Sequence, residues 1–299
     1  MAGSGRRLRR RRRGRPRLAV ATVALAIALG IVAVVASATD KGGRPAVSTG
    51  SAPTQTSAPR AVSHHPRAHH PLFAGAPAID SVLRYTPFIS RGGPRRRVIA
   101  LTFDDGPSPY TQKIVGLLLR MHAPATFFIV GQQLTDFAAG LRDEVQHGFE
   151  IGDHTENHAP LNRLGAGGQL GQIRDAAIRM TRLGARFPRL FRPPYGYYDA
   201  TTLATLHGLH MLMVMWSIDP RDWLRPGTKT IVAKVLSAAI PGGIVELHDG
   251  GGDRTETLAA LPAIINGLRR KHYRLVTVER LLALDPPPRN QPLPHPSGA

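Results

Sequence analysis

The sequence predicts an α/β fold in which a parallel sheet closes, or nearly closes, into a barrel surrounded by helices. From Val98 onward, short apolar runs typical of buried strands alternate with longer runs typical of helices. Polar side chains follow five of the seven strand-like runs. Barrel enzymes gather their functional groups at this end of the strands, so both observations favour the same architecture.

The expected elements follow one another with little chain between them. Strands are expected at residues 98–103, 125–130, 148–153, 187–191, 211–218, 242–248 and 273–278. Helices are expected between them, at residues 111–122, 133–147, 168–185, 199–208, 229–239 and 255–271. The folded domain is therefore predicted to cover 79–284, and a chain of this size buries roughly 70% of the surface that it exposes when unfolded.

The chain begins with features of an exported protein. Residues 1–17 contain nine Arg and no acid, and an uncharged, mostly apolar run extends from Leu18 to Ala36. A helix over that run is ~28 Å long, close to the thickness of a bilayer core. Residues 1–17 are predicted to be a basic cytoplasmic segment, and residues 18–38 are either a transmembrane anchor or a signal region cleaved near Ala38.

Two further segments are predicted to be disordered. Residues 39–78 are rich in Ala, Pro, Ser, Gly and His, and 285–299 is a Pro-rich tail. Residues 39–78 are predicted to be a linker between the N-terminal helix and the domain. The domain is therefore expected outside the cytoplasm, either anchored to the membrane or secreted.

Charge and cysteine content exclude several classes of function. The net charge of +19 is concentrated in residues 1–97, which carry a net +16, whereas residues 98–299 carry only +3. A nucleic-acid interface needs its basic patch on the folded surface, so no nucleic-acid partner is expected. The chain has no Cys, which excludes disulfides, thiol catalysis and Cys-ligated metal sites.

Two short strings contain the parts of a hydrolytic metal site. Asp104 and Asp105 in TFDDG follow the first expected strand, and His154 and His158 lie in HTENH after the third. On a helical turn this spacing puts both imidazoles on one face, with about 5–6 Å between their Cβ atoms, close enough to share one ion. One carboxylate can then bind the metal while its neighbour accepts a proton from water. A turn at DDGP and a chance pair of exposed His are the alternatives.

Other polar groups follow later strands. Arg192 in RPPY can orient a carboxylate through a bidentate hydrogen bond, and IDPRDW offers Asp219, Asp222 and an apolar plate, Trp223. In the expected strand 242–248, alternation places Ile244, Glu246 and His248 on one face and Val245 and Leu247 on the other. Each string also has a purely structural explanation, as a surface ion pair, a capped turn or a core side chain.

The strings TFDDG, HTENH, RPPY, DPRDW and ELHD, in this order, resemble the motifs of the polysaccharide deacetylase family, also called NodB-like or carbohydrate esterase family four. The resemblance covers most of residues 80–283. It implies a distorted (β/α)7 barrel. It also implies a metal-dependent hydrolase that removes N-acetyl groups from a polysaccharide containing N-acetylglucosamine, such as peptidoglycan or a chitin-like polymer.

The resemblance implies a metal site and a set of substrate contacts. Asp105, His154 and His158 would bind one divalent metal ion, most often zinc, with cobalt or nickel as alternatives. Trp223, Leu247 and Glu246 are assigned to substrate binding, Trp223 as a wall of the acetyl pocket.

The resemblance also implies the catalytic groups. Asp104 would be the general base, oriented by Arg192. Tyr195 would offer its backbone N–H to the oxyanion. His248 would be the general acid, with Asp222 tuning its charge.

Two residues depart from the family pattern. Glu246 stands where relatives have an apolar residue in the acetyl pocket. Our hypothesis is that it alters acyl specificity or engages a second cation. Asp153 stands where many relatives have Asn, and we expect its side chain to face away from the metal.

Three other functions remain open at this point. An O-acetyl esterase acting on xylan-type glycans would use the same catalytic groups. Two His and one carboxylate also make the iron site of non-haem oxygenases. A non-catalytic glycan-binding module is the third alternative.

Overall fold

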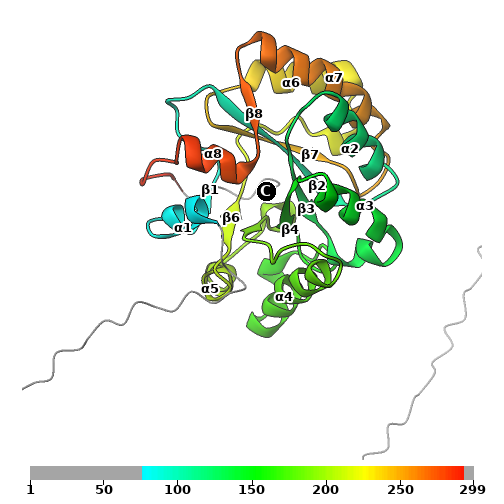
Figure 1. Ribbon diagram of the computed structural model, residues 1–299. Helices are drawn as coiled ribbons and strands as arrows, with labels where there is room; N and C mark the ends of the chain where they lie inside the picture. Colours follow the sequence, from blue (N-terminus) through cyan, green and yellow to red (C-terminus); the bar gives the residue numbers. More distant parts are fainter. Residues whose placement is uncertain (1–75, 293–299) are drawn as a thin grey trace, which may run out of the picture. The chain divides into compact units, whose positions relative to one another are not determined.

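The computed structural model describes residues 76–292 (Figure 1). The chain divides into two units, 1–64 and 65–299, and every described residue belongs to the second. The expected basic segment, the anchor or signal region and nearly all of the linker lie outside the described residues, as does the end of the tail. Within the described part of the chain, no helix has the length and apolar character needed to cross a bilayer.

The strands within residues 76–292 form one parallel sheet. Their order is β1-β6-β5-β4-β3-β2-β7, and β8 pairs with the beginning of β2. Their bounds are β1 (Phe88–Ile89), β2 (Val98–Gly106), β3 (Thr126–Ile129), β4 (Glu150–Asp153), β5 (Leu190–Phe191), β6 (Leu212–Val214), β7 (Gly243–His248) and β8 (Arg274–Val276). Each expected strand corresponds to one of these, and β1 is additional.

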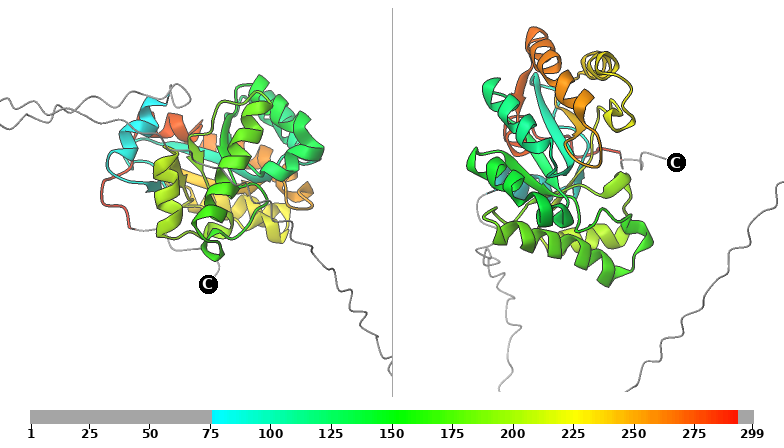
Figure 2. Two further views of the ribbon diagram at one scale, coloured as in Figure 1. Left: turned by 90° about the horizontal axis from the view of Figure 1, so that it is seen from below. Right: turned by 90° about the vertical axis from the view of Figure 1, so that its right-hand side faces the viewer.

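Helices surround the strands in Figures 1 and 2. Their bounds are α1 (Pro77–Leu83), α2 (Thr111–Arg120), α3 (Leu134–Gln146), α4 (Ala166–Arg182), α5 (Ala200–Gly208), α6 (Thr228–Ala238), α7 (Thr255–Arg270) and α8 (Val278–Leu284). The six expected helices are α2 to α7, with ends that differ by at most three residues. Helices α1 and α8 are additional, and each is only seven residues long.

The sheet is a half-barrel rather than a closed ring of paired strands. In the part of the chain that the structure describes, the edge strands β1 and β7 do not pair with each other. The segment that follows β6 approaches β7 through a single bridge between Ile218 and Val245. Because β1 and β5 have two residues each and β6 has three, this side of the sheet has few backbone pairs.

The two faces of the sheet pack against different parts of the molecule. Ile99, Leu101 and Phe103 of β2 lie on the outer face, in a hydrophobic cluster with the apolar sides of the surrounding helices. Val98 and Ala100 lie on the inner face, in a second cluster that includes buried residues of α1 and α8. The inner space of the half-barrel is therefore filled at the amino ends of the strands.

The inner face becomes polar toward the carboxyl ends of the strands. Thr102 of β2 is in register with Glu246 of β7, and Asp104 is in register with His248 one layer further along. Ile244, next to the apolar layer, is fully buried. The register therefore places a Thr–Glu layer directly beneath an Asp–His layer.

The predicted end of the domain at residue 284 is too early. The Asp285 side chain is buried and accepts hydrogen bonds from the backbone N–H groups of Arg95 and Arg96, at 2.6 and 2.7 Å. The Tyr85 hydroxyl donates to the Pro287 carbonyl at 2.9 Å. A Pro-rich composition led to the wrong boundary because it does not reveal these long-range contacts.

Candidate active site

A cavity of about 600 Å³ opens at the carboxyl ends of the strands. Polar groups that the sequence placed after β2, β4, β6 and β7 line it. The residues that line it are Asp104, Asp105, His154, His158, Pro193, Tyr195, Tyr197, Trp216, Asp219, Arg221, Trp223, Glu246, His248, Gly251 and Arg254.

Asp105, His154 and His158 converge on one point of this cavity. Oδ1 of Asp105 lies 3.5 Å from Nε2 of His154 and 3.1 Å from Nε2 of His158. One ligand atom from each residue lies within 4.8 Å of the other two. The three predicted metal ligands are thus within reach of a single ion.

The two imidazoles meet through a loop, and the expected helical turn is absent. Thr155 and His158 have positive φ values of 71° and 59°, which no helix contains. The His158 backbone N–H donates to Thr155 Oγ1 at 3.0 Å. Asp153 also shapes this loop, because its buried side chain accepts from the Thr155 N–H at 2.7 Å through Oδ1.

The three side chains fit a divalent cation. Apart from the two imidazole nitrogens, the buried Oδ1 of Asp105 has no hydrogen-bond partner among residues 76–292. His154 Nδ1 donates to the Arg192 carbonyl at 2.7 Å, which leaves Nε2 without its proton and aimed at the other ligands. His158 Nδ1 lies 3.1 Å from the Tyr195 hydroxyl, which holds this ring beside the other two side chains.

The Asp105 side chain is ionised, which the binding of a cation requires. Burial alone would raise its pKa, but the imidazoles of His154 and His158 and the positive charge of His248 hold the pKa well below its usual value. One carboxylate and two imidazoles form a donor set that zinc accepts, with a coordination position left for water.

Asp104 lies beside this group and is held by a buried guanidinium. Nη1 of Arg192 donates to Asp104 Oδ1 at 2.7 Å and to Thr102 Oγ1 at 2.8 Å. The expected bidentate contact is not formed, because Nε and Nη2 donate to the carbonyls of Val214 and Met215. Arg192 therefore contacts only one oxygen of Asp104, and Asp104 itself lines the cavity.

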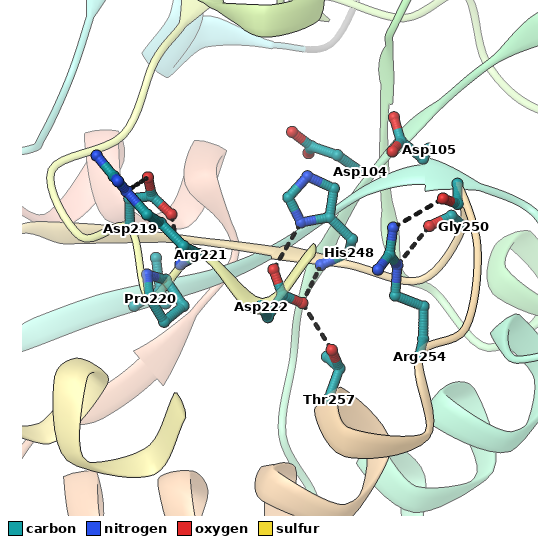
Figure 3. A network of polar contacts seen from close by, with 12 residues as sticks. Asp104, Asp105, Asp219, Pro220, Arg221, Asp222, His248, Gly250, Arg254 and Thr257 are labelled. Carbon is teal, nitrogen blue, oxygen red and sulfur yellow. Dashed lines mark hydrogen bonds and ion pairs between the residues drawn. The ribbon is translucent and has the colours of Figure 1, made fainter. Parts of the chain in front are cut away.

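His248 faces Asp104 from β7 and is paired with Asp222 (Figure 3). Its Nδ1 donates to Asp222 Oδ1 at 2.7 Å, while Asp222 Oδ2 accepts from the His248 backbone N–H and from Thr257 Oγ1. Burial by itself lowers the pKa of His248, but Asp222, assisted by Asp105 and Glu246, raises it to about 10. His248 therefore carries a proton at neutral pH.

Tyr195 and Trp223 lie at the rim, with relative exposures of 52% and 48%. Tyr195 follows two prolines and has a left-handed backbone with φ of 60°. Its backbone N–H donates no backbone hydrogen bond within the described residues. Both residues are therefore in place to contact a substrate at the entrance.

The structure separates the two remaining substrate-binding assignments. Glu246 lines the cavity, but Leu247 does not: it is fully buried in the outer hydrophobic cluster. Strand alternation explains the difference, because neighbouring residues of β7 point to opposite faces. The assignment of Leu247 to substrate binding is therefore wrong.

Three residues that support the site were not predicted. Thr102 accepts a hydrogen bond from Arg192. Figure 3 shows the other two: Thr257 of α7 donates to Asp222, and Arg254 donates to the carbonyls of the loop after β7, those of Gly250 and Gly251. Thr102 shares the inner face with Asp104, so strand alternation contained a signal for it. Thr257 is far from Asp222 in the chain, and no local pattern connects the two.

The sequence is similar to those of known polysaccharide deacetylases. The family model for polysaccharide deacetylase matches residues 91–214. A peptidoglycan-N-acetylglucosamine deacetylase of Bacillus cereus is 39% identical over 189 residues, which is 62% of this chain and 88% of the relative. A chitooligosaccharide deacetylase of Bradyrhizobium is 34% identical over 202 residues, covering 62% of this chain and 90% of the relative.

The fold is similar to that of solved structures as well. A crystal structure of a peptidoglycan N-acetylglucosamine deacetylase in complex with 4-naphthalen-1-yl-N-oxidanyl-benzamide has a TM-score of 0.64 and 30% sequence identity. The similarity covers 68% of this chain and 96% of that chain.

Proposed function

Because this chain belongs to the polysaccharide deacetylase family, whose members are metal-dependent carbohydrate hydrolases, we propose that it removes N-acetyl groups from N-acetylglucosamine units of a cell-envelope or chitin-like polysaccharide. The observation that carries the proposal is the convergence of Asp105, His154 and His158 opposite the Asp104–His248 pair. A metal-ligand set on one side and two proton-transfer groups on the other are what amide hydrolysis needs.

The metal would be held by Asp105, His154 and His158, and zinc suits these donors best, with cobalt or nickel as alternatives. Such an ion polarises a carbonyl and lowers the pKa of water. The identity of the metal is part of the proposal.

The chain's own residues supply the proton transfers. Asp104 accepts a proton from the water molecule that attacks the carbonyl carbon of the acetyl group, and Arg192 fixes the orientation of the Asp104 carboxylate during this step. The Tyr195 N–H donates to the developing oxyanion, where the loss of one such donor costs on the order of 10²–10³ in rate. His248 gives its proton to the departing nitrogen as the C–N bond breaks, which yields acetate and a free amine.

An O-acetyl esterase is the alternative within the same family chemistry, since a departing alkoxide also takes a proton from His248. Acetate release from N-acetylated oligosaccharides and from acetylated xylan, each with and without a chelator, separates the two. We expect chelator-sensitive release from the N-acetylated oligomers. Release from xylan alone favours the esterase, and binding without release by metal-loaded protein favours a glycan-binding module.

The place of action is a further part of the proposal. The Arg-rich start and the apolar run at residues 18–38 support an extracytoplasmic domain, with the membrane as partner if the run is an anchor. Fractionation of cells that express the full chain, followed by N-terminal sequencing of the mature protein, distinguishes the anchored form from the cleaved one. Full-length protein in the cytoplasmic fraction would contradict both.

A further inference from the structure

Glu246 lies at the floor of the proposed active site. It is in register with Thr102, one layer beneath Asp104 and His248. Only 6% of Glu246 is exposed, yet it lines the cavity. A carboxylate oxygen of Glu246, one of Asp104 and a ring nitrogen of His248 all lie within 4.8 Å of one another.

The Glu246 carboxyl has no hydrogen bond within residues 76–292, although charged groups surround it. Burial is the largest cause that raises its pKa well above the usual value, and Asp104 and Asp219 add to this effect. The positive charges of His248 and Arg192 act in the opposite direction. An unpaired polar group in a buried position is costly, and the open side of this one faces the substrate cavity.

The remaining groups of the site determine which part of the substrate reaches Glu246. The carbonyl oxygen must face the Asp105–His154–His158 group and the Tyr195 N–H. The departing nitrogen must face His248. That nitrogen carries the sugar, which can leave only by the rim. The remaining substituent of the carbonyl carbon, which is the methyl group in an acetyl, therefore lies against the floor of the cavity.

We propose that Glu246 is a specificity-determining residue that favours N-acyl groups carrying a hydroxyl, of which hydroxyacetyl is the smallest, over plain acetyl. The inference rests on the proposed amidase function and names its acyl group. The reaction remains a hydrolysis: water adds to the carbonyl carbon, the C–N bond breaks, and hydroxyacetate and the amine leave. The Glu246 carboxyl takes part only by a hydrogen bond to the acyl hydroxyl.

The expected selectivity follows from the unpaired carboxyl. An acetyl methyl group would cover it without supplying a partner, whereas a hydroxyl on the same carbon would pair with it. Sites built to hydrogen-bond a substrate hydroxyl discriminate strongly against the analogue that lacks it. Binding of a second cation by Asp104, Glu246 and His248 is disfavoured, because the positive charge of Arg192 already neutralises Asp104.

The test compares kcat/KM for two series of chitooligosaccharides, one N-acetylated and one N-hydroxyacetylated. The wild-type enzyme should prefer the hydroxyacetyl series by about 10-fold or more, and Glu246→Leu should shift the ratio toward acetyl by about 10–100-fold. Glu246→Gln should keep part of the preference, since its amide can still pair with a hydroxyl. Asp219→Asn, which removes another carboxylate of the cavity nearer the solvent, should leave the ratio unchanged.

Equal ratios for wild type and Glu246→Leu, or an equal shift in Asp219→Asn, overturn the inference. Inability of the metal-loaded wild type to hydrolyse either series counts instead against the proposed amidase function. Competitive inhibition by the acid products is a second measurement that needs no folded variant. Hydroxyacetate should inhibit the wild type about 10-fold more strongly than acetate, and equal inhibition also overturns the inference.

Discussion

At the scale of single residues, the pairing of His248 with Asp222 explains how an imidazole can serve as the acid in a neutral solution. Isolated imidazoles lose most of their protonated form near pH 7. Here one oxygen of Asp222 bonds the ring and the other bonds the backbone of the same residue, so the carboxylate is fixed relative to the proton that it stabilises. We expect the same contact to set the upper pH limit of activity.

Asp222→Asn should therefore move the alkaline limb of the kcat profile to lower pH. In the wild type, we expect activity to fall as pH rises through about 10, where His248 loses its proton. The charge of Asp222 is the largest cause that raises the pKa of His248, so its removal returns that pKa toward 6.5. The pairing stabilises the fold fully below pH 6.5, and that contribution is lost as pH rises through about 10.

Thr257→Val is the matched control for this measurement, because it removes a hydrogen bond to Asp222 but keeps the charge beside His248. A profile of Asp222→Asn that superimposes on that of the wild type contradicts the assignment of His248 as the acid.

At the scale of elements, the fully buried Glu144 and the half-buried Glu150 have opposite surroundings. Glu144 of α3 has no partner for either carboxylate oxygen within residues 76–292. Glu150 of β4 accepts from Thr126 Oγ1 and from the backbone N–H groups of Val278 and Glu279, and thereby joins β4 to the start of α8. Burial raises the pKa of both groups, that of Glu150 to about 7.

Glu144→Leu should increase the free energy of unfolding by about 1–3 kcal/mol at pH 7, whereas Glu150→Leu should decrease it by about 2–4 kcal/mol. A carboxyl whose pKa is raised in the folded state binds a proton that the unfolded state releases above about pH 4.5, so its presence weakens the fold as pH rises. The gain from Glu144→Leu should thus grow between pH 4.5 and 7 in urea unfolding. A loss of stability in Glu144→Leu contradicts this account.

The loop after β7 limits the space around the proposed metal ligands. Gly251 has a φ of 71°, and a Cβ atom there would lie 2.3 Å from Oδ2 of Asp105. Gly251→Ala should displace that carboxylate and weaken zinc binding by about 10–100-fold in a chelator competition. Gly252→Ala, with φ of 135° and its nearest neighbour at 3.8 Å, is a control for backbone strain alone. Equal affinities in the two variants contradict the prediction.

The elements also show what the sequence can predict. The apolar runs predict β2 to β8 and α2 to α7, because each of these elements buries apolar side chains in the hydrophobic clusters. They do not predict α1, β1 and α8, which have seven, two and seven residues. Spacing predicts that His154 and His158 meet, but for a wrong reason, since positive φ values in a loop and not a helical turn bring them together.

At the scale of the whole described molecule, the half-barrel is polar at one end and closed by short helices at the other. Helices α1 and α8 fill the inner space at the amino ends of the strands, and Asp285 connects this region to the chain leading into β2. The polar residues of the inner face therefore lie next to an apolar layer.

Asp285→Ala should lower the free energy of unfolding by about 2–4 kcal/mol, because it leaves two backbone N–H groups without their acceptor and removes an ion pair with Arg95. Thermal unfolding monitored by circular dichroism measures the change. Asp175→Ala removes an exposed ion pair with Arg174 and is the control, with an expected change below about 0.5 kcal/mol. Equal effects of the two substitutions contradict a structural role for the segment after α8.

The central claim is that Asp105, His154 and His158 hold one divalent cation, and anomalous X-ray diffraction at the zinc edge from zinc-soaked crystals tests it most directly. We expect a single strong peak about 2.0–2.2 Å from an Asp105 oxygen and from Nε2 of both imidazoles. A well-ordered site without such a peak, or a peak held by other side chains, would contradict the account.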